Sequence, residues 1–329
     1  MTVQNQKHQT RTAANYPPAI FLMGPTASGK SGVALEIARH LPVEIISVDS
    51  AQVYRHMNIG TAKPSAETRA AVPHHLIDLI EPHERYSAAQ FRDDALTAMR
   101  EITERGNIPL LVGGTMLYFR ALLEGLSELP AADSNVRMVI DSMAEDRGWP
   151  ALHQELQRLD LASAARIQPA DSQRIQRALE VYYLTNKPMS EMLKKPKYVY
   201  LPYRMTHIAL IPSDREILHR HIAQRFEAML ELGLIGEVRA VRDKFGLDAD
   251  SPAMRCVGYR QVGMYLDKEV SLSEMRSMGL AATRQLAKRQ LTWLRPMQGL
   301  QKFDCLAQDL PQQVLEYLEA TGLQAAAVS

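Results

Sequence analysis

Short runs of apolar residues alternate with stretches of helical periodicity through the first half of the chain. Several runs are almost continuously Ile, Val and Leu, which is typical of strands buried on both faces of a parallel sheet. They occupy residues 19–24, 44–49, 108–113 and 207–211, with a short last run at 301–303. Residues 88–105 repeat apolar side chains with a helical period and stop before Gly106. Strands that alternate with helices predict an α/β fold, a parallel sheet with helices on both faces.

The pattern changes in the middle of the chain, where the strands disappear. Three short helices are predicted there, over residues 134–147, 150–159 and 171–186. We therefore expect a small helical domain at residues 133–200, inserted into an α/β core formed by residues 18–132 and 201–329. From residue 214 to about 297 the core continues as helices. Residues 1–17 are polar without an apolar segment, so we expect a disordered tail there rather than a secretion signal.

The first predicted strand leads into the sequence GPTASGKS, which matches G-x-x-x-x-G-K-[ST] in full. Its glycines allow backbone N–H groups to turn toward an anion, and the following helix adds its positive end. The lysine supplies a point charge for a phosphate, and the last serine can hold Mg²⁺. The pattern predicts a P-loop NTPase-like core with a polyphosphate site at Gly24, Pro25, Thr26, Ala27, Ser28, Gly29, Lys30 and Ser31. The spacing alone is typical of ATP or GTP binding, and it does not reveal which polyphosphate is held.

Polar residues follow the next two predicted strands. Asp49 ends the second strand, and Thr115 follows a pair of glycines at the end of the third. Because the carboxyl ends of parallel strands line the ligand crevice, we expect both residues beside the phosphate loop. Asp49 could bind a metal ion or take a proton from a nucleophile, and its alternative role is a cap. The glycines allow close approach of the backbone to a ligand, or form a plain turn.

The composition of the chain excludes several classes of protein. Apolar residues make up 46% of the 329 residues, enough for a sizeable core, and no run of eighteen apolar residues could span a membrane. Two cysteines form neither a disulfide framework nor a zinc site, so a reducing cytoplasm fits best. The net charge is only +1, yet residues 251–297 carry eight basic and three acidic side chains. A basic region on a neutral protein predicts a polyanionic partner, or else an ordinary solvated helix face.

Three segments combine basic side chains with amide or aromatic groups, the equipment for gripping phosphates and stacking on bases. In the first segment Arg174 and Arg177 share one helix face, opposite Ile175. The segments are Gln173, Arg174, Ile175, Gln176 and Arg177; then Arg255, Cys256, Val257, Gly258, Tyr259 and Arg260; then Lys288, Arg289, Gln290, Leu291, Thr292, Trp293, Leu294 and Arg295.

Seven motifs in order, GPTASGKS, SVDSAQVY, IGTAKP, VGGT, QRIQR, RCVGYR and KRQLTWLR, resemble the tRNA dimethylallyltransferases, also called isopentenylpyrophosphate transferases. The resemblance covers nearly all of the chain after the tail. It implies that the loop grips the diphosphate of dimethylallyl diphosphate with Mg²⁺ at Ser31, and that no phosphoryl group moves. It also implies a general base at Asp49 and catalytic help from Lys30, Arg225 and Thr115. The chain lacks the cysteine-rich module of eukaryotic members, which indicates the bacterial type.

The same resemblance implies a nucleic-acid partner. The acceptor would be the N6 amine of the adenosine next to the anticodon on its 3′ side, extruded from its stack. The anticodon arm of the tRNA would be held by the three basic segments and by Asp49, Ser50, Ala51, Gln52, Thr115 and Arg137. The family implies a cytoplasmic enzyme with no membrane contact and no obligate protein partner, acting as a monomer.

Three other functions share parts of this pattern. A small-molecule kinase would have the loop, the strand-end aspartate and a helical lid, but would not need the distant basic segments. A prenyltransferase acting on free adenylate would use similar chemistry without a large basic surface. A non-catalytic RNA-binding ATPase would not need Asp49 beside an intact loop.

Overall fold

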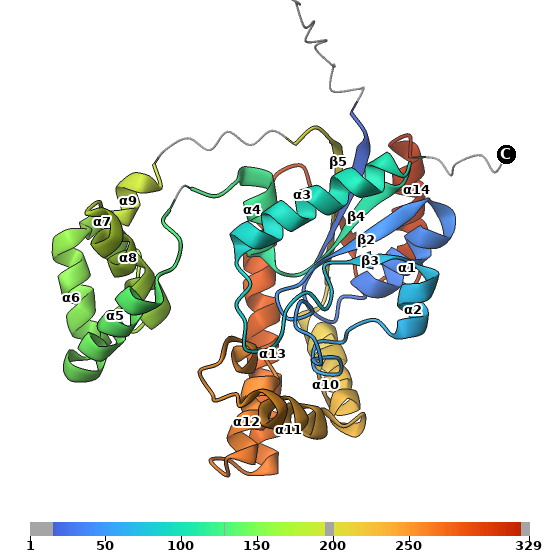
Figure 1. The fold of residues 1–329 in the computed structure, drawn as a ribbon. Helices are drawn as coiled ribbons and strands as arrows, with labels where there is room; N and C mark the ends of the chain where they lie inside the picture. Colours follow the sequence, from blue (N-terminus) through green and yellow to red (C-terminus); the bar gives the residue numbers. More distant parts are fainter. Residues whose placement is uncertain (1–15, 128, 195–200, 324–329) are drawn as a thin grey trace, which may run out of the picture. The chain divides into compact units, whose positions relative to one another are not determined.

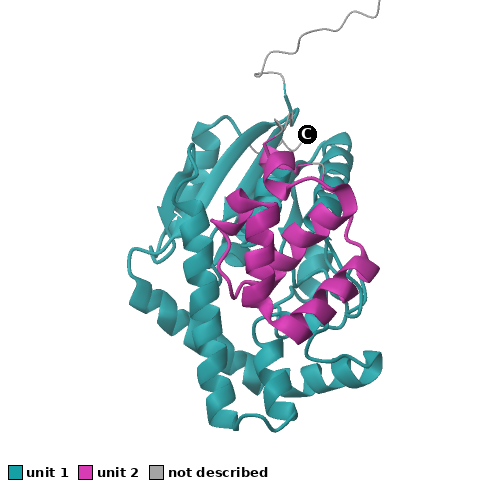
Figure 2. Cartoon of the chain, turned by 90° about the vertical axis from the view of Figure 1, so that its left-hand side faces the viewer, with its two compact units in different colours: residues 1–122, 201–329 teal, residues 123–200 magenta. Residues whose placement is uncertain are grey.

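The computed structural model describes residues 16–127, 129–194 and 201–323 and divides the chain into two compact units (Figures 1 and 2). The larger unit is formed by Met1–Leu122 with Leu201–Ser329, and the helical unit by Leu123–Tyr200. The helical unit thus begins earlier than the expected residue 133. The reason is that the preceding segment contacts it, since the Arg177 guanidinium donates to the Pro130 carbonyl at 2.6 Å. Most of the tail expected at 1–17 lies outside the described residues.

A parallel six-stranded sheet forms the centre of the larger unit, with the strand order β3-β2-β4-β1-β5-β6. The strands are β1 Pro18–Met23, β2 Val43–Val48, β3 His74–His75, β4 Ile108–Gly113, β5 Arg204–Ile211 and β6 Gln301–Asp304. Five of them coincide with predicted strands, and the α/β prediction is confirmed. The two-residue β3 was not predicted because a pair of histidines carries no alternation of apolar and polar positions.

Helices cover both faces of this sheet. On one face α1 Lys30–His40 and α14 Leu310–Ala320 bury Ile37 and Val314 against Ile20 and its neighbours. On the other face lie α3 Ala88–Glu104 and α4 Met116–Glu124, and Phe119 of α4 contacts Phe21 of β1 with ring centroids 6.1 Å apart. Successive side chains of β1 point to opposite faces of the sheet and meet helices on both, so β1 is apolar at nearly every position.

The remaining helices of this unit gather beyond the carboxyl ends of the strands (Figure 1). They are α10 Arg215–Glu231, α11 Leu234–Phe245, the 3₁₀ turn Pro252–Arg255, α12 Tyr259–Leu266 and the long α13 Leu272–Leu294, while the short α2 Ala66–Ala71 precedes β3. Their second core buries Tyr259, Phe226 and Leu234 together with Val53 and Met57 of the segment after β2. This packing makes a wall opposite the strand ends.

The helical unit has its own core. It contains α5 Ser134–Arg147, α6 Trp149–Leu159, α7 Leu161–Ala164, α8 Ser172–Thr185 and α9 Met189–Met192. Ile140, Leu152 and Leu179 are fully buried within it. The three predicted helices are present, and α7 and α9 are single turns too short to leave a periodic signal.

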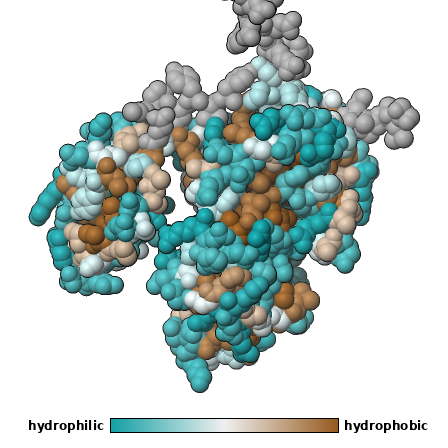
Figure 3. All heavy atoms as spheres, in the orientation of Figure 1, coloured by the Kyte–Doolittle hydropathy of each residue, from teal (hydrophilic) through white to brown (hydrophobic). Residues whose placement is uncertain are grey.

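The surface of both units is largely hydrophilic on the face drawn in Figure 3, with hydrophobic residues gathered in patches on each of them. Among the helices that the structure describes, none is long and apolar enough to cross a membrane.

Candidate functional site

The phosphate loop lies between β1 and α1, the strand–loop–helix context that its sequence predicted. Ala27 and Gly29 have φ of 61° and 78°, so the loop passes twice through the left-handed region. A Cβ on Gly24 would lie 2.8 Å from the Ser28 Oγ and 3.0 Å from the carbonyl oxygen of Leu210. A side chain at the start of the loop would therefore force Ser28 or the neighbouring strand to shift.

Ser28 of this loop is buried, and its hydroxyl group is unpaired within the part of the chain that the structure describes. It is 2% exposed, and its hydroxyl has no hydrogen-bond partner among the described residues. A buried polar atom without a partner costs free energy, so such atoms are rare in native structures unless a ligand or water completes them.

Lys30, at the first position of α1, also faces the loop. Its Nζ donates to the Pro25 carbonyl at 2.6 Å. Burial, reinforced by the nearby guanidinium of Arg225 and opposed by Asp49, lowers the pKa of Lys30 to about 8. Burial likewise lowers the pKa of Arg225, with Asp49 again opposing. Two half-buried cations with lowered pKa values lie near a single carboxylate, so the site favours a further anion.

Asp49 follows β2 and lines the same cavity. Its Oδ1 accepts the backbone N–H of Ala51 at 2.8 Å and that of Gln52 at 3.4 Å. The segment after Asp49 is a turn and the next helix begins only at Ala66, so the alternative of a helix cap is wrong and the position at the ligand crevice holds. Two backbone donors fix the carboxylate in one orientation.

Thr115 joins the ends of two strands. Its Oγ1 accepts the backbone N–H of Ser50 at 3.0 Å, and its own N–H donates to the Val48 carbonyl at 3.2 Å. Gly113 is required here because a Cβ would lie 2.0 Å from the Val48 carbonyl oxygen. The close approach predicted for this glycine is thus to the neighbouring strand.

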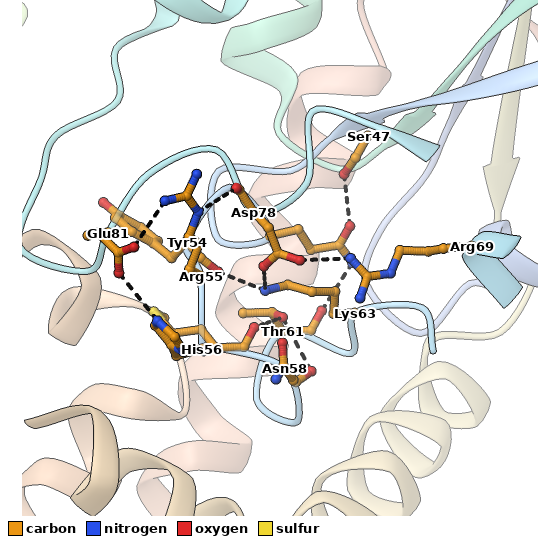
Figure 4. Close-up of polar contacts among 12 residues, drawn as sticks. Ser47, Tyr54, Arg55, His56, Asn58, Thr61, Lys63, Arg69, Asp78 and Glu81 are labelled. Atoms are coloured by element: carbon orange, nitrogen blue, oxygen red, sulfur yellow. Dashed lines mark hydrogen bonds and ion pairs between the residues drawn. The ribbon is translucent and has the colours of Figure 1, made fainter. Parts of the chain in front are cut away.

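A polar network holds the segment that follows Asp49 in the chain (Figure 4). Gln52 accepts from the Ser47 hydroxyl at 2.8 Å and donates to the Thr61 carbonyl at 3.2 Å. Lys63 donates to the Tyr54 carbonyl at 2.7 Å and pairs with Asp78 at 2.6 Å. These bonds tie the sequence IGTAKP to the strand end that carries Asp49.

A carboxylate from α11 fixes the same segment from the other side. Glu237 accepts the backbone N–H groups of Asn58, Ile59 and Gly60 at 2.8 to 3.0 Å, and also the hydroxyl of Tyr259. Burial, with Glu237 beside it, raises the pKa of Tyr259 far above its ordinary value. Sequence reasoning missed Glu237 because a single acid in a helix carries no signal.

The expectation that Tyr259 stacks on RNA bases is wrong. The ring is fully buried, and a Cβ on Gly60 would lie 2.5 Å from its Cε2 atom. Ile175 and Leu294 are equally buried, as the apolar faces of their helices require. These three side chains pack in the protein core and anchor the segments that were predicted to bind RNA.

Together these elements enclose a cavity of about 680 Å³ within the larger unit. The predicted catalytic residues Lys30, Asp49, Thr115 and Arg225 all line it, with Thr26, Ala27, Ser31, Ser50, Ala51, Gln52, Arg255, Cys256, Val257, Gly258 and Gln290. Burial, with Asp49 nearby, raises the pKa of Cys256 to about 12, so this thiol stays neutral. Apolar walls from Ile222, Phe226 and Met229 complete a space suited to a ligand with an anionic end and an apolar end.

Other predicted residues lie elsewhere. Lys288, Arg289 and Arg295 are exposed at the end of α13, and the exposed Trp293 ring lies 5.5 Å from the Arg120 guanidinium carbon. Arg260 is exposed at the start of α12. The larger unit therefore presents basic side chains as the charge pattern predicted.

Arg137 and Arg177 of the helical unit hold a buried acid. The Glu180 carboxylate is fully buried and accepts from Arg137 at 2.8 Å and from Arg177 at 2.6 Å. Burial opposes its ionisation, but the two guanidinium groups hold the pKa of Glu180 below its usual value. Arg174 is exposed on the same helix. Arg174 also pairs with Asp171 at 3.5 Å at the start of α8. Arg137 and Arg177, by contrast, share a buried partner that sequence reasoning did not foresee.

The donor set suits a magnesium ion bound together with a phosphate. Among the described residues no group of three or more His, Cys, Asp or Glu side chains could hold a metal ion. Mg²⁺ commonly takes only one or two protein oxygens and completes its shell with phosphate oxygens and water. The Ser31 hydroxyl and the Asp49 carboxylate, which line one cavity, fit that arrangement.

Comparisons with known proteins agree with this geometry. The sequence profile described as IPP transferase matches residues 52–297, and the one described as isopentenyl transferase matches residues 18–78. A protein of Nitrosospira multiformis named tRNA dimethylallyltransferase is 69% identical, covering 95% of this chain and 97% of its own length. A protein of Nitrosomonas europaea with the same name is 62% identical, covering 93% and 97%.

Solved structures show the same likeness. The tRNA isopentenylpyrophosphate transferase of Bacillus halodurans is similar with a TM-score of 0.67 and 36% identity, covering 93% of this chain and 95% of its own. A eukaryotic dimethylallyltransferase acting on tRNA is similar with a TM-score of 0.74 and 25% identity, covering 95% and 81%.

Proposed function

This chain belongs to the IPP transferase family, and on that premise we propose that it is a tRNA dimethylallyltransferase. It transfers the dimethylallyl group of dimethylallyl diphosphate to the N6 amine of the adenosine on the 3′ side of the anticodon, and it releases diphosphate. One observation carries the proposal beyond the family. The phosphate loop and a fixed carboxylate, Asp49, line one cavity that also has apolar walls.

The loop stabilises the leaving group. As the carbon–oxygen bond of the allylic diphosphate breaks, negative charge grows on the departing diphosphate. Lys30 and Arg225 line the cavity in which this charge develops, and positive groups already held in place stabilise it more than mobile water does. Mg²⁺ at Ser31, when bound, adds further positive charge to neutralise the diphosphate.

Asp49 serves the other reactant. The N6 amine of adenosine is a weak nucleophile because its lone pair is delocalised into the ring. A carboxylate held by the N–H groups of Ala51 and Gln52 can accept a hydrogen bond from this amine and take its proton as the carbon–nitrogen bond forms. The adenine reaches Asp49 only if it leaves the base stack of the anticodon loop.

The RNA is held by charge outside the cavity. Arg260, Lys288, Arg289 and Arg295 are the exposed cations of the larger unit that suit the phosphates of an anticodon arm, and Arg174 is one in the helical unit. As the family resemblance implies, we also propose that the enzyme acts as a monomer. A tRNA substrate implies work in the cytoplasm.

The test is an assay that offers every candidate substrate. The chain is incubated with labelled dimethylallyl diphosphate and either tRNA or AMP, and separately with ATP and each acceptor. We expect label to enter tRNA alone, at the adenosine beside the anticodon, with one diphosphate released per transfer. Label in AMP would instead favour an adenylate prenyltransferase, and stoichiometric ATP hydrolysis a kinase or ATPase.

A further inference from the structure

Gln290 lies within the exposed basic stretch of α13 but points inward. Lys288 and Arg289 just before it are exposed, whereas Gln290 is 9% exposed and lines the cavity. Its Oε1 accepts the backbone N–H of Thr26 at 2.8 Å, and its Nε2 donates to the Gly114 carbonyl at 2.9 Å. One side chain therefore connects the phosphate loop, the end of β4 and the basic helix.

The contact is specific for an amide. The side chain must accept at one end and donate at the other, which an amide does and a carboxylate or an alkyl group does not. The space is equally restricted, because a Cβ on Gly114 would lie 2.3 Å from the Gln290 Nε2. The glycine of VGGT thus makes room for the amide of KRQLTWLR.

We propose that Gln290 is a positioning residue that fixes the phosphate loop and couples the RNA-binding surface of α13 to the diphosphate site. This inference rests on the proposed function. When RNA phosphates bind Lys288 and Arg289, they restrain α13. Through Gln290 this helix holds the phosphate loop at Thr26. A restrained loop loses less freedom when it closes on diphosphate, so tRNA raises the affinity for diphosphate. By linkage, diphosphate raises the affinity for tRNA by the same factor.

The test replaces the amide with an apolar side chain of similar length. In Gln290→Met both hydrogen bonds are lost, so the Thr26 N–H and the buried Gly114 carbonyl lose their partner. Gln285→Met is the matched control, because Gln285 is exposed on the same helix. The affinity for inorganic diphosphate with Mg²⁺ is measured by calorimetry, with and without an anticodon stem-loop, and KM and kcat are measured for dimethylallyl diphosphate.

We expect Gln290→Met to weaken diphosphate binding by about tenfold, the usual scale for leaving buried polar groups unpaired. KM should rise more than kcat falls, and the enhancement by the stem-loop should disappear. Gln285→Met should keep both properties. Normal diphosphate affinity together with a normal stem-loop enhancement in Gln290→Met would overturn the inference while leaving the transferase activity established. Failure of the unaltered chain to use dimethylallyl diphosphate would instead overturn the proposed function.

A second variant covers the case in which Gln290→Met does not fold. Gly114→Ala leaves Gln290 in place but forces its amide away from the Gly114 carbonyl. It should reproduce the weaker diphosphate binding and the lost enhancement. If a folded Gly114→Ala variant keeps the normal diphosphate affinity and the normal stem-loop enhancement, the proposed role of Gln290 is contradicted.

Discussion

The ammonium group of Lys30 donates a hydrogen bond to the carbonyl oxygen of Pro25, the second residue of its own phosphate loop, at 2.6 Å. The side chain is thereby folded over the place where an anion would lie. Burial, rather than an ion pair with a carboxylate, has the largest effect on the pKa of this lysine.

The first prediction concerns protons taken up on binding. Burial, together with Arg225, lowers the pKa of Lys30 to about 8, so a growing fraction of this lysine is neutral as pH rises above that value. A bound diphosphate favours the charged form, raises the pKa again and draws in a proton. The affinity for diphosphate should therefore fall as pH rises through about 8 and 9.

Calorimetry in buffers of different ionisation enthalpy measures this uptake. Lys30→Arg is the control, because arginine stays protonated while the protons of diphosphate itself behave as before. Proton uptake at pH 8.5 that is equal in the two proteins would show that Lys30 does not change its charge.

The second prediction concerns the general base. Asp49→Asn keeps an oxygen that can accept from Ala51 and Gln52, so the local turn should survive. The amide cannot take a proton, and turnover should fall by about 10²–10⁴, the usual worth of general acid–base catalysis. Single-turnover transfer rates and tRNA affinity are compared. Near-normal transfer by this variant would remove Asp49 from the role of base.

The third prediction separates two arginines from different units. Arg289 is exposed, whereas Arg177 binds the fully buried Glu180. Arg289→Ala should lower the slope of log tRNA affinity against log salt by up to about one unit, because one phosphate contact is lost. Arg177→Ala should instead lower the melting temperature of the helical unit, since Glu180 keeps its burial and loses a partner.

Salt titrations and thermal unfolding of both variants decide this. Diphosphate affinity is the internal control and should change in neither. If Arg289→Ala leaves the slope unchanged, α13 is an ordinary solvated face and the anticodon arm docks elsewhere.

The fourth prediction concerns stability in acid. Glu44 of β2 is buried and accepts two hydrogen bonds from Arg105 and one from Asn107, and His75 lies 2.6 Å away. The hydrogen bond from Arg105 is the main reason that the pKa of Glu44 falls to about 2. A carboxyl with a lowered folded pKa stabilises the protein above its ordinary pKa of 4.5, and this contribution is lost as pH falls toward 2.

Urea unfolding between pH 7 and pH 2.5 measures this contribution, which amounts to at most about 3 kcal/mol. Glu44→Gln should be less stable at pH 7 and should lose less stability on acidification. Glu104→Gln, at an exposed position of α3, is the control. Parallel curves for the unaltered chain and Glu44→Gln would contradict the prediction.

Much of the α/β core follows from local sequence. Continuous apolar runs identify strands buried on both faces, and the phosphate loop carries its own geometry in Gly24 and Gly29. The position of Asp49 at a strand end then places it at the crevice without further information. These features depend on neighbours in the chain, and for that reason a single sequence contains them.

Contacts between distant segments could not be predicted in the same way. Glu237 meets Gly60, and Gln290 meets Thr26, only because α11 and α13 pack beyond the strand ends. The charge pattern likewise could not tell Arg177, which faces a buried acid, from Arg289, which faces water. Burial at such positions depends on tertiary packing, and the residue type alone does not report it.

The strand order also has a consequence for the synthesis of the chain. β1 pairs on one side with β4 and on the other with β5, whose register sets Pro18 against Arg204. On the ribosome, β1 therefore has a free edge until the whole helical unit has been made, and long-range parallel pairing of this kind is slow. The helical unit, with a core of its own, can fold first. A chain that ends before Arg204 would contain a complete helical unit, but β1 would lack its partner β5. The unpaired edge of β1 would then be prone to aggregation.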